Sequence, residues 1–261
     1  MHSCPTNNNY GHAEVYKSYV DVDVNMLIKG RLQHGWSAEY AGVVAEESFK
    51  GNYYVWNEKS GKFGRDFDGK INPLPTDRVF VVGSPILYYE EGVKEVDYDD
   101  LLFISKHSLR AKLVSDKDWI RFIKYVKSTA ADGTILISQR DLDLGRGKLI
   151  EDSGLYWECA GRPDLISFFP NLIEILSSFT SVIATNAQTA LFYALYIGKW
   201  VMIDGPNMDT GDYCERFVLD KSWTKEKFPE LLKGTDDKNI ADWELGLEFK
   251  KSKEDLKRIM F

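Results

Sequence analysis

Three of the four histidines in the chain stand in short polar motifs: YGH around His12, QHGW around His34 and KHS around His107. An imidazole titrates near neutral pH, so it can take a proton from a hydroxyl group or return one to a leaving group. His34 and His107 directly follow apolar runs, as polar side chains at the carboxyl end of a buried strand do. We interpret His34 and His12 as candidate catalytic residues, with a purely structural role for each as the open alternative.

The KHS motif also has the chemistry to bind a phosphate. Lys106 and His107 can neutralise a phosphoryl group, and the hydroxyl of Ser108 adds a hydrogen-bond donor. We therefore predict that these three residues meet the phosphates of a bound nucleotide.

Glycines at two turns are further candidates for ligand binding. Gly83 and Ser84 end an apolar run in a tight turn, where a glycine allows close approach to the backbone. Gly161 lies in a loop of small residues, CAGR, before an expected helix. We predict ligand contacts at all three residues, and ordinary turns are the alternative.

Residues 181–203 carry the clearest pattern in the chain, which predicts a strand, a polar turn, a helix and a second strand. Thr185 and Asn186 are of the types that begin helices, so we expect the helix to start there. A helix N-terminus at the carboxyl edge of a sheet offers N–H groups and a positive dipole end to a phosphate. We predict that Asn186, Gln188 and Thr189 contact a phosphate, and a packing unit without ligand is the alternative.

Apolar runs and helical stripes alternate along the second half of the chain. This order is typical of a doubly wound parallel sheet with helices on both faces. The expected strands are residues 53–56, 79–82, 101–104, 134–137, 182–184 and 200–203, and the expected helices begin near 115, 169, 186 and 252. An acidic stretch, residues 88–99, predicts the boundary between a compact N-terminal α/β domain, residues 1–92, and a C-terminal domain, residues 93–261.

Composition limits the classes of partner. The chain has 261 residues and a formal net charge of −7, which disfavours nucleic acid as the main partner. The three cysteines, Cys4, Cys159 and Cys214, are far apart and odd in number, so a disulfide framework or a zinc site is not expected. Neither a signal peptide nor a transmembrane segment is apparent. We expect a cytoplasmic protein, with peripheral membrane association open.

Two acidic pairs have the Asp-x-Asp spacing that binds a metal-nucleotide complex in some transferases. They are Asp21 with Asp23 and Asp141 with Asp143. We interpret both pairs as solvated acids, and we expect no bound metal and no cofactor besides the substrate.

The order of these motifs, continued by NAQTA from Asn186, resembles a group of GT-B glycosyltransferase-like proteins of surface-polysaccharide and lipopolysaccharide gene clusters. The HG pair at His34 is also similar to that of CDP-glycerol glycerophosphotransferases. The resemblance covers about residues 10–260. It implies two Rossmann-like domains, with the nucleotide bound mainly by the C-terminal one and the acceptor on the N-terminal side.

The resemblance also implies an activity. A sugar would pass from a nucleotide-sugar donor to a glycan hydroxyl, without a metal, in surface or capsid glycan biosynthesis. His34 would be the base or orient the acceptor, and the KHS and NAQTA motifs would hold the donor phosphates. The alternatives are transfer of a polyol phosphate, as from CDP-glycerol, and a non-catalytic glycan-binding protein on a transferase fold.

Overall fold

The computed structural model describes residues 5–36, 38, 48–65, 70–90, 100–105, 114–208 and 221–261. The chain forms two compact units. The first unit comprises Met1–Gly92, Pro163–Phe169 and Asn239–Phe261, and the second comprises Val93–Arg162 and Pro170–Lys238. The first segment of the first unit ends at the expected boundary, but residues 239–261, which we had placed in the C-terminal domain, belong to the first unit.

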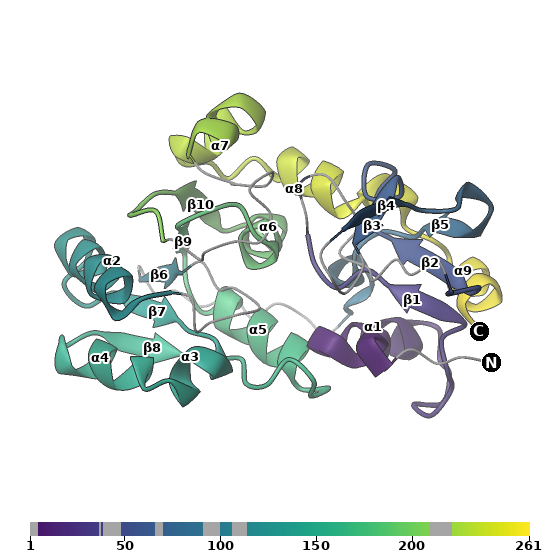
Figure 1. The fold of residues 1–261 in the computed structure, drawn as a ribbon, viewed down its shortest axis with the longest axis horizontal. Coiled ribbons are helices and arrows are strands. Elements are labelled where there is room, and N and C mark those ends of the chain that lie inside the picture. Colours follow the sequence, from purple (N-terminus) through teal and green to yellow (C-terminus); the bar gives the residue numbers. More distant parts are fainter. Residues whose placement is uncertain are drawn as a thin grey trace. The chain divides into compact units, whose positions relative to one another are not determined.

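The second unit contains a five-stranded parallel sheet with the strand order β10-β9-β6-β7-β8 (Figure 1). The expected α/β class with parallel strands is therefore confirmed. The strands are β6 (Leu101–Ile104), β7 (Thr134–Leu136), β8 (Tyr156–Glu158), β9 (Ser181–Ala184) and β10 (Trp200–Ile203). The helices around them are α2 (Asp116–Thr129), α3 (Gln139–Asp143), α4 (Arg146–Asp152), α5 (Phe168–Ser177), α6 (Thr189–Tyr196) and α7 (Lys221–Lys227), with the 3₁₀ helix η6 (Pro229–Leu232).

Helix α2 shows how the sequence pattern becomes packing. The side chain of Ser115 accepts a hydrogen bond from the N–H of Asp118, which caps the first turn. An apolar stripe along the helix then packs in one buried cluster with side chains from the three central strands and from α4. The cluster includes Trp119, Phe122, Ile123, Val126, Phe103, Ile135, Ile183 and Ile150. Each fully buried large side chain contributes roughly 1.5–3 kcal/mol to stability.

The first unit contains a three-stranded parallel sheet with the order β1-β2-β5 and an antiparallel hairpin of β3 with β4. The strands are β1 (Gly30–Leu32), β2 (Asn52–Val55), β3 (Phe63–Arg65), β4 (Ile71–Pro73) and β5 (Val79–Val81). The helices are η1 (Pro5–Gly11), α1 (His12–Tyr19), η2 (Thr76–Arg78), η3 (Pro85–Tyr88), α8 (Lys238–Leu245), η7 (Leu247–Phe249) and α9 (Lys253–Met260). The sequence patterns had not predicted α1, β8 or the β3–β4 hairpin.

Hydrogen bonds explain why the C-terminal segment belongs to the first unit. The hydroxyl of Tyr54, on the central strand β2, donates to the carbonyl of Ile259 at 2.6 Å. The N–H of Lys29 donates to the carbonyl of Met260 at 2.9 Å. Helix α9 is thus tied to β2 and to the start of β1, although more than 200 residues separate Tyr54 from Ile259.

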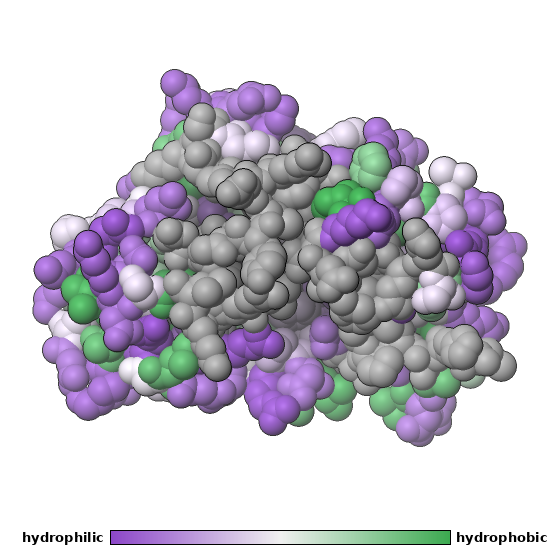
Figure 2. Space-filling view, in the orientation of Figure 1, coloured by the Kyte–Doolittle hydropathy of each residue, from purple (hydrophilic) through white to green (hydrophobic). Residues whose placement is uncertain are grey.

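The coloured surface in Figure 2 is mainly hydrophilic, with small hydrophobic patches between charged residues. Among the residues that the structure describes, Trp243 and Tyr156 are the most exposed large apolar side chains, each 66% accessible. Within the described parts of the chain, no helix has both the length and the apolar character that crossing a membrane requires.

Gly246 provides a test of the packing in the first unit, and Gly145 of the second unit serves as its control. Gly246 has φ of +74°, and a Cβ atom there would lie 1.9 Å from the carbonyl oxygen of Trp56. We expect Gly246→Ala to lower the free energy of unfolding by about 3 kcal/mol or more, because the backbone must move. Gly145→Ala is the matched control, with φ of +80° and nothing within 4 Å of the added atom. Gly145→Ala should lower the free energy of unfolding by about 1 kcal/mol, measured by urea denaturation. Equal losses of stability in the two variants would contradict the close packing of Gly246 against Trp56.

Candidate functional site

The strand order of the second unit reverses between β6 and β9. From β6 the chain adds β7 and β8 on one side, then returns to the other side of β6 to add β9 and β10. In an open parallel sheet the crossovers on either side of such a point lie on opposite faces, which leaves a crevice at the carboxyl ends of the two strands. The described residues at this point are Ser105, after β6, and Thr185 to Gln188, after β9.

The two strand ends are joined by hydrogen bonds. The N–H of Thr185 donates to the carbonyl of Ile104 at 3.1 Å, and Nε2 of Gln188 donates to the carbonyl of Ser105 at 3.5 Å. Nδ2 of Asn186 donates to the carbonyl of Ala187 at 3.0 Å. Asn186 and Gln188 are only 9% and 8% exposed, so the turn is held in one shape before any ligand arrives.

Helix α6 begins three residues later than the sequence predicted. Its N-cap is Gln188, with an extended backbone, and its first residue is Thr189. The expectation of a start at Thr185 and Asn186 is wrong, because their backbone and amide groups bond within the turn and to β6. The Gln188 side chain makes no capping bond to its own helix. The structure thus brings Asn186, Gln188 and Thr189 together at the strand-order reversal, beside Ser105.

Lys106, His107 and Ser108, the predicted phosphate ligands, lie outside the described residues. The chain connects them directly to Ser105 at the end of β6. Their contacts with phosphate stay a prediction.

The loops after β7 and β8, at the same sheet edge, carry both acidic and basic residues. Asp141 is only 2% exposed, so it is not a solvated acid, and burial raises the pKa of its carboxyl group. Burial, together with the charges of Asp143 and Glu158, raises the pKa of the Cys159 thiol. The raised pKa of the Cys159 thiol argues against a thiolate nucleophile, as the sequence indicated.

Gly161 lies in the loop after β8. Its φ is +89°, and no atom lies within 4 Å of the place where a Cβ would stand. Its N–H donates to Sγ of Cys159 at 3.3 Å. The positive φ explains the glycine, and its predicted ligand contact stays a prediction.

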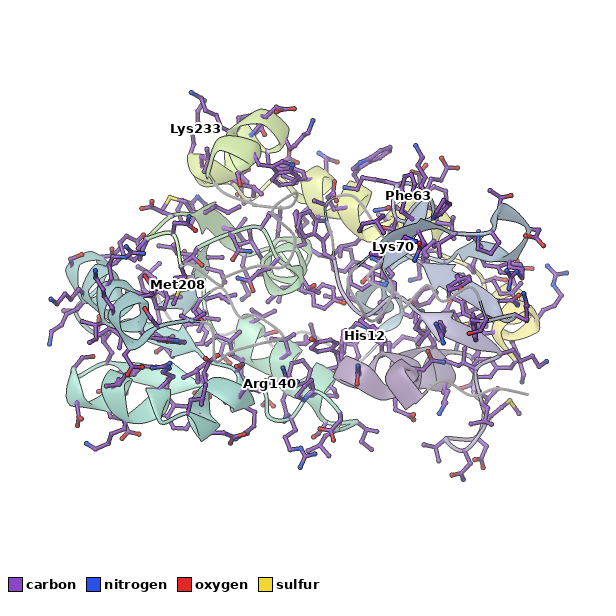
Figure 3. All side chains as sticks on the ribbon, in the orientation of Figure 1. His12, Phe63, Lys70, Arg140, Met208 and Lys233 are labelled. Atoms are coloured by element: carbon purple, nitrogen blue, oxygen red, sulfur yellow. The ribbon has the colours of Figure 1, made fainter. Side chains whose placement is uncertain are left out.

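His12 and His34 lie close together in the first unit. His34 follows β1, as the sequence predicted, and His12 is the first residue of α1 (Figure 3). The ring of His12 lies among aromatic rings, 6.0 Å from that of Trp56 and 5.7 Å from that of Phe169. His12 is 2% exposed, whereas His34 is half-buried. The burial of His12 favours the structural alternative, and its catalytic role stays a prediction.

The pKa values of both imidazoles are strongly lowered. Burial lowers that of His12 to about 3, helped by charge on His34 and opposed by a hydrogen bond with the backbone of Gln33. Burial and the Arg31 guanidinium lower that of His34 to about 4. Both rings are therefore neutral at pH 7, and the low pKa values make each a weak base. A nearby anion would raise the pKa of His34 and make it a stronger base.

A set of buried polar contacts holds the loop that carries His34. Oε1 of Gln33 accepts from the N–H of Trp56, and its Nε2 donates to the carbonyl of Gly35. Nε1 of Trp36 donates to Oε2 of Glu244 at 2.5 Å. The sequence did not point to Glu244, because a lone glutamate 208 positions from its partner leaves no local pattern.

Glu244 binds Trp36, Lys59 and Asn57 in the first unit. Nζ of Lys59 lies 2.7 Å from Oε2 of Glu244, and Nδ2 of Asn57 donates to the Glu244 carbonyl at 2.9 Å. Glu244 is 3% exposed, and a buried carboxylate requires such partners. The C-terminal helix α8 thus stabilises the carboxyl edge of the first sheet.

Gly83 and Ser84 also pack against the C-terminal segment of the first unit. Gly83 has φ of +78°, and a Cβ there would lie 3.0 Å from the carbonyl oxygen of Gly246. Ser84 is fully buried, and its N–H donates to the carbonyl of Leu245 at 2.8 Å. The close backbone approach predicted for Gly83 is thus made by the chain itself, and this packing does not support a ligand contact at either residue.

Comparisons with protein-family models, with curated proteins and with solved structures found no match. A search of the described residues found no group of three or more histidine, cysteine, aspartate or glutamate side chains placed to hold a metal ion.

The two imidazoles predict a pH dependence of stability. Their folded pKa values lie below 6.5, so the unfolded chain binds more protons between about pH 3 and 6.5. We expect the free energy of unfolding to fall as the pH decreases from 7 to 4. His12→Gln should flatten this dependence by on the order of 2–3 kcal/mol, measured by urea denaturation at each pH. Parallel curves for the two proteins would show that His12 is not the group responsible.

Proposed function

We propose that the protein is a glycosyltransferase of GT-B-like architecture, which moves a sugar from a nucleotide-sugar donor to a glycan hydroxyl without a metal. The observation that carries the proposal is the strand-order reversal at β6 and β9, with the N-terminus of α6 directly beside it. Sheets of this order bind nucleotides at that point, with the pyrophosphate at a helix N-terminus.

The chemistry of the turn supports a diphosphate ligand. The side-chain amides of Asn186 and Gln188 and the hydroxyl of Thr189 are neutral donors, and the α6 dipole adds partial positive charge. Because the turn is already ordered by its bonds to β6, little ordering entropy is lost on binding.

The transfer needs a base and a stabilised leaving group. A new bond forms between the acceptor oxygen and the anomeric carbon, while the bond from that carbon to the donor phosphate breaks. The acceptor proton passes to the base, and the nucleoside diphosphate leaves with the electron pair. We assign the base to His34, which is neutral at pH 7 and half-buried, and the stabilisation of the leaving group to the α6 N-terminus.

Nucleotide binding can be tested at the first residue of α6. Thr189→Asp places a negative charge where the diphosphate would bind, and Thr189→Asn is the neutral control of the same size. We expect the aspartate variant to bind UDP, GDP or CDP at least about tenfold more weakly than the control in calorimetry. An aspartate at this position also favours the helix, so unfolding does not account for the loss. Equal affinities would place the nucleotide elsewhere.

The assignment of His34 as the base can be tested by measuring the rate of turnover. We expect His34→Ala to release nucleoside diphosphate from a panel of nucleotide sugars about a hundredfold more slowly, with binding of the donor retained. With a pKa of about 4, wild-type kcat/KM should stay level from pH 7 down to about pH 5. His34→Ala turnover within a few-fold of wild type would remove His34 from the mechanism. Reaction with CDP-glycerol alone would favour polyol-phosphate transfer, and glycan binding without nucleotide affinity would favour a non-catalytic role.

A further inference from the structure

Strand β5 is an outer strand of the first sheet, and one row of its backbone groups points away from the sheet. The N–H of Val82 donates to the carbonyl of Val55 on β2, at 2.9 Å. Because N–H and C=O directions alternate along a strand, those of Phe80 also face β2, whereas those of Val79 and Val81 face outward. Among the described residues, no hydrogen bond to the outward groups of Val81 is present.

Two other outer edges are closed by the chain itself. Asn7 covers β1: its Nδ2 donates to the carbonyl of Gly30 at 2.8 Å, and its Oδ1 accepts from the N–H of Leu32 at 2.9 Å. Thr235 covers β10 through two bonds with Val201, of 2.8 and 2.9 Å. An uncovered edge can pair with another extended chain, so the contrast with β5 is informative.

The outward edge of β5 borders an open groove of about 460 Å³. Its other wall is the C-terminal helix α9 and the residue that precedes its cap, and the two elements lie near each other in Figure 1. The wall from α9 consists of Lys251, Asp255, Arg258 and Ile259. The groove therefore offers backbone hydrogen bonds on one side and charged and apolar side chains on the other.

The charge of the groove indicates which kind of ligand it can bind. The charged side chains that line the groove are Lys251, Arg258 and Asp255, although the whole chain has a formal charge of −7. Asp255 is already paired with Arg258 at 2.6 Å. Within the described residues Lys251 has no ion-pair partner, so the lining carries a net positive charge. A second copy of the chain would bring a lining of the same net positive charge to the groove, so self-pairing along β5 is disfavoured.

We propose that the β5 edge is a docking site for an extended peptide with acidic side chains, which adds as a fourth strand of the first sheet. The outward N–H and C=O groups of Val79 and Val81 form the ladder, and alternate peptide carboxylates meet Lys251 on the facing wall of the groove. This site is independent of the nucleotide-binding edge of the second unit.

The test uses the full chain and a fluorescein-labelled octapeptide of alternating valine and glutamate, followed by fluorescence anisotropy. A peptide with lysine in place of glutamate is the charge control. We expect the lysine peptide to bind at least about tenfold more weakly. Val81→Pro removes the outward N–H and should abolish binding, while Val81→Thr keeps the N–H and should not. Lys251→Glu should weaken binding of the glutamate peptide and favour the lysine peptide.

A second measurement covers the case in which Val81→Pro does not fold. N-methylation of alternate peptide amides blocks the ladder without a change in the protein, and it should abolish binding in one of the two registers. Equal binding of the two peptides, binding that survives both the proline and N-methylation, or no binding at millimolar peptide would overturn the proposal. A wild-type dimer that becomes monomeric in Val81→Pro would overturn it in favour of self-pairing.

Discussion

The reversal of strand order between β6 and β9 is the constraint on which the second unit depends. Right-handed crossovers place the preceding helices on one face of the sheet and the following helices on the other. The ends of β6 and β9 therefore stand together without a helix packed over their shared edge. The hydrogen bonds from Thr185 and Gln188 to β6 join these ends, and the start of α6 is fixed beside them. The meeting of the two strand ends at this point is a consequence of the chain path.

The first unit is held by a different principle, in which distant backbone segments close a sheet edge. Glu244 binds Trp36 and Lys59, Ser84 bonds to Leu245, and Gly83 approaches Gly246. These contacts come from a C-terminal segment that returns to the N-terminal sheet. They keep the His34 loop in place, where burial and the Arg31 guanidinium lower the pKa of His34.

The histidine pair shows how packing separates two similar residues. Both stand in glycine-containing motifs, and both are neutral at pH 7. His12 is enclosed by aromatic rings, whereas His34 keeps part of its surface open to solvent. The distinction rests on burial that no motif encodes.

The sequence by itself determined the α/β class, the parallel strands of the second unit and the position of His34 after a strand. These follow from local signals: apolar runs of strand length, a serine cap before an apolar stripe, and polar residues where a strand ends. The start of α6, helix α1, strand β8 and the roles of Glu244 and Gly83 were decided by the tertiary structure. Each depends on partners far along the chain, such as β6 for the turn at Asn186 and Gly246 for Gly83, and a local pattern carries no information about such partners.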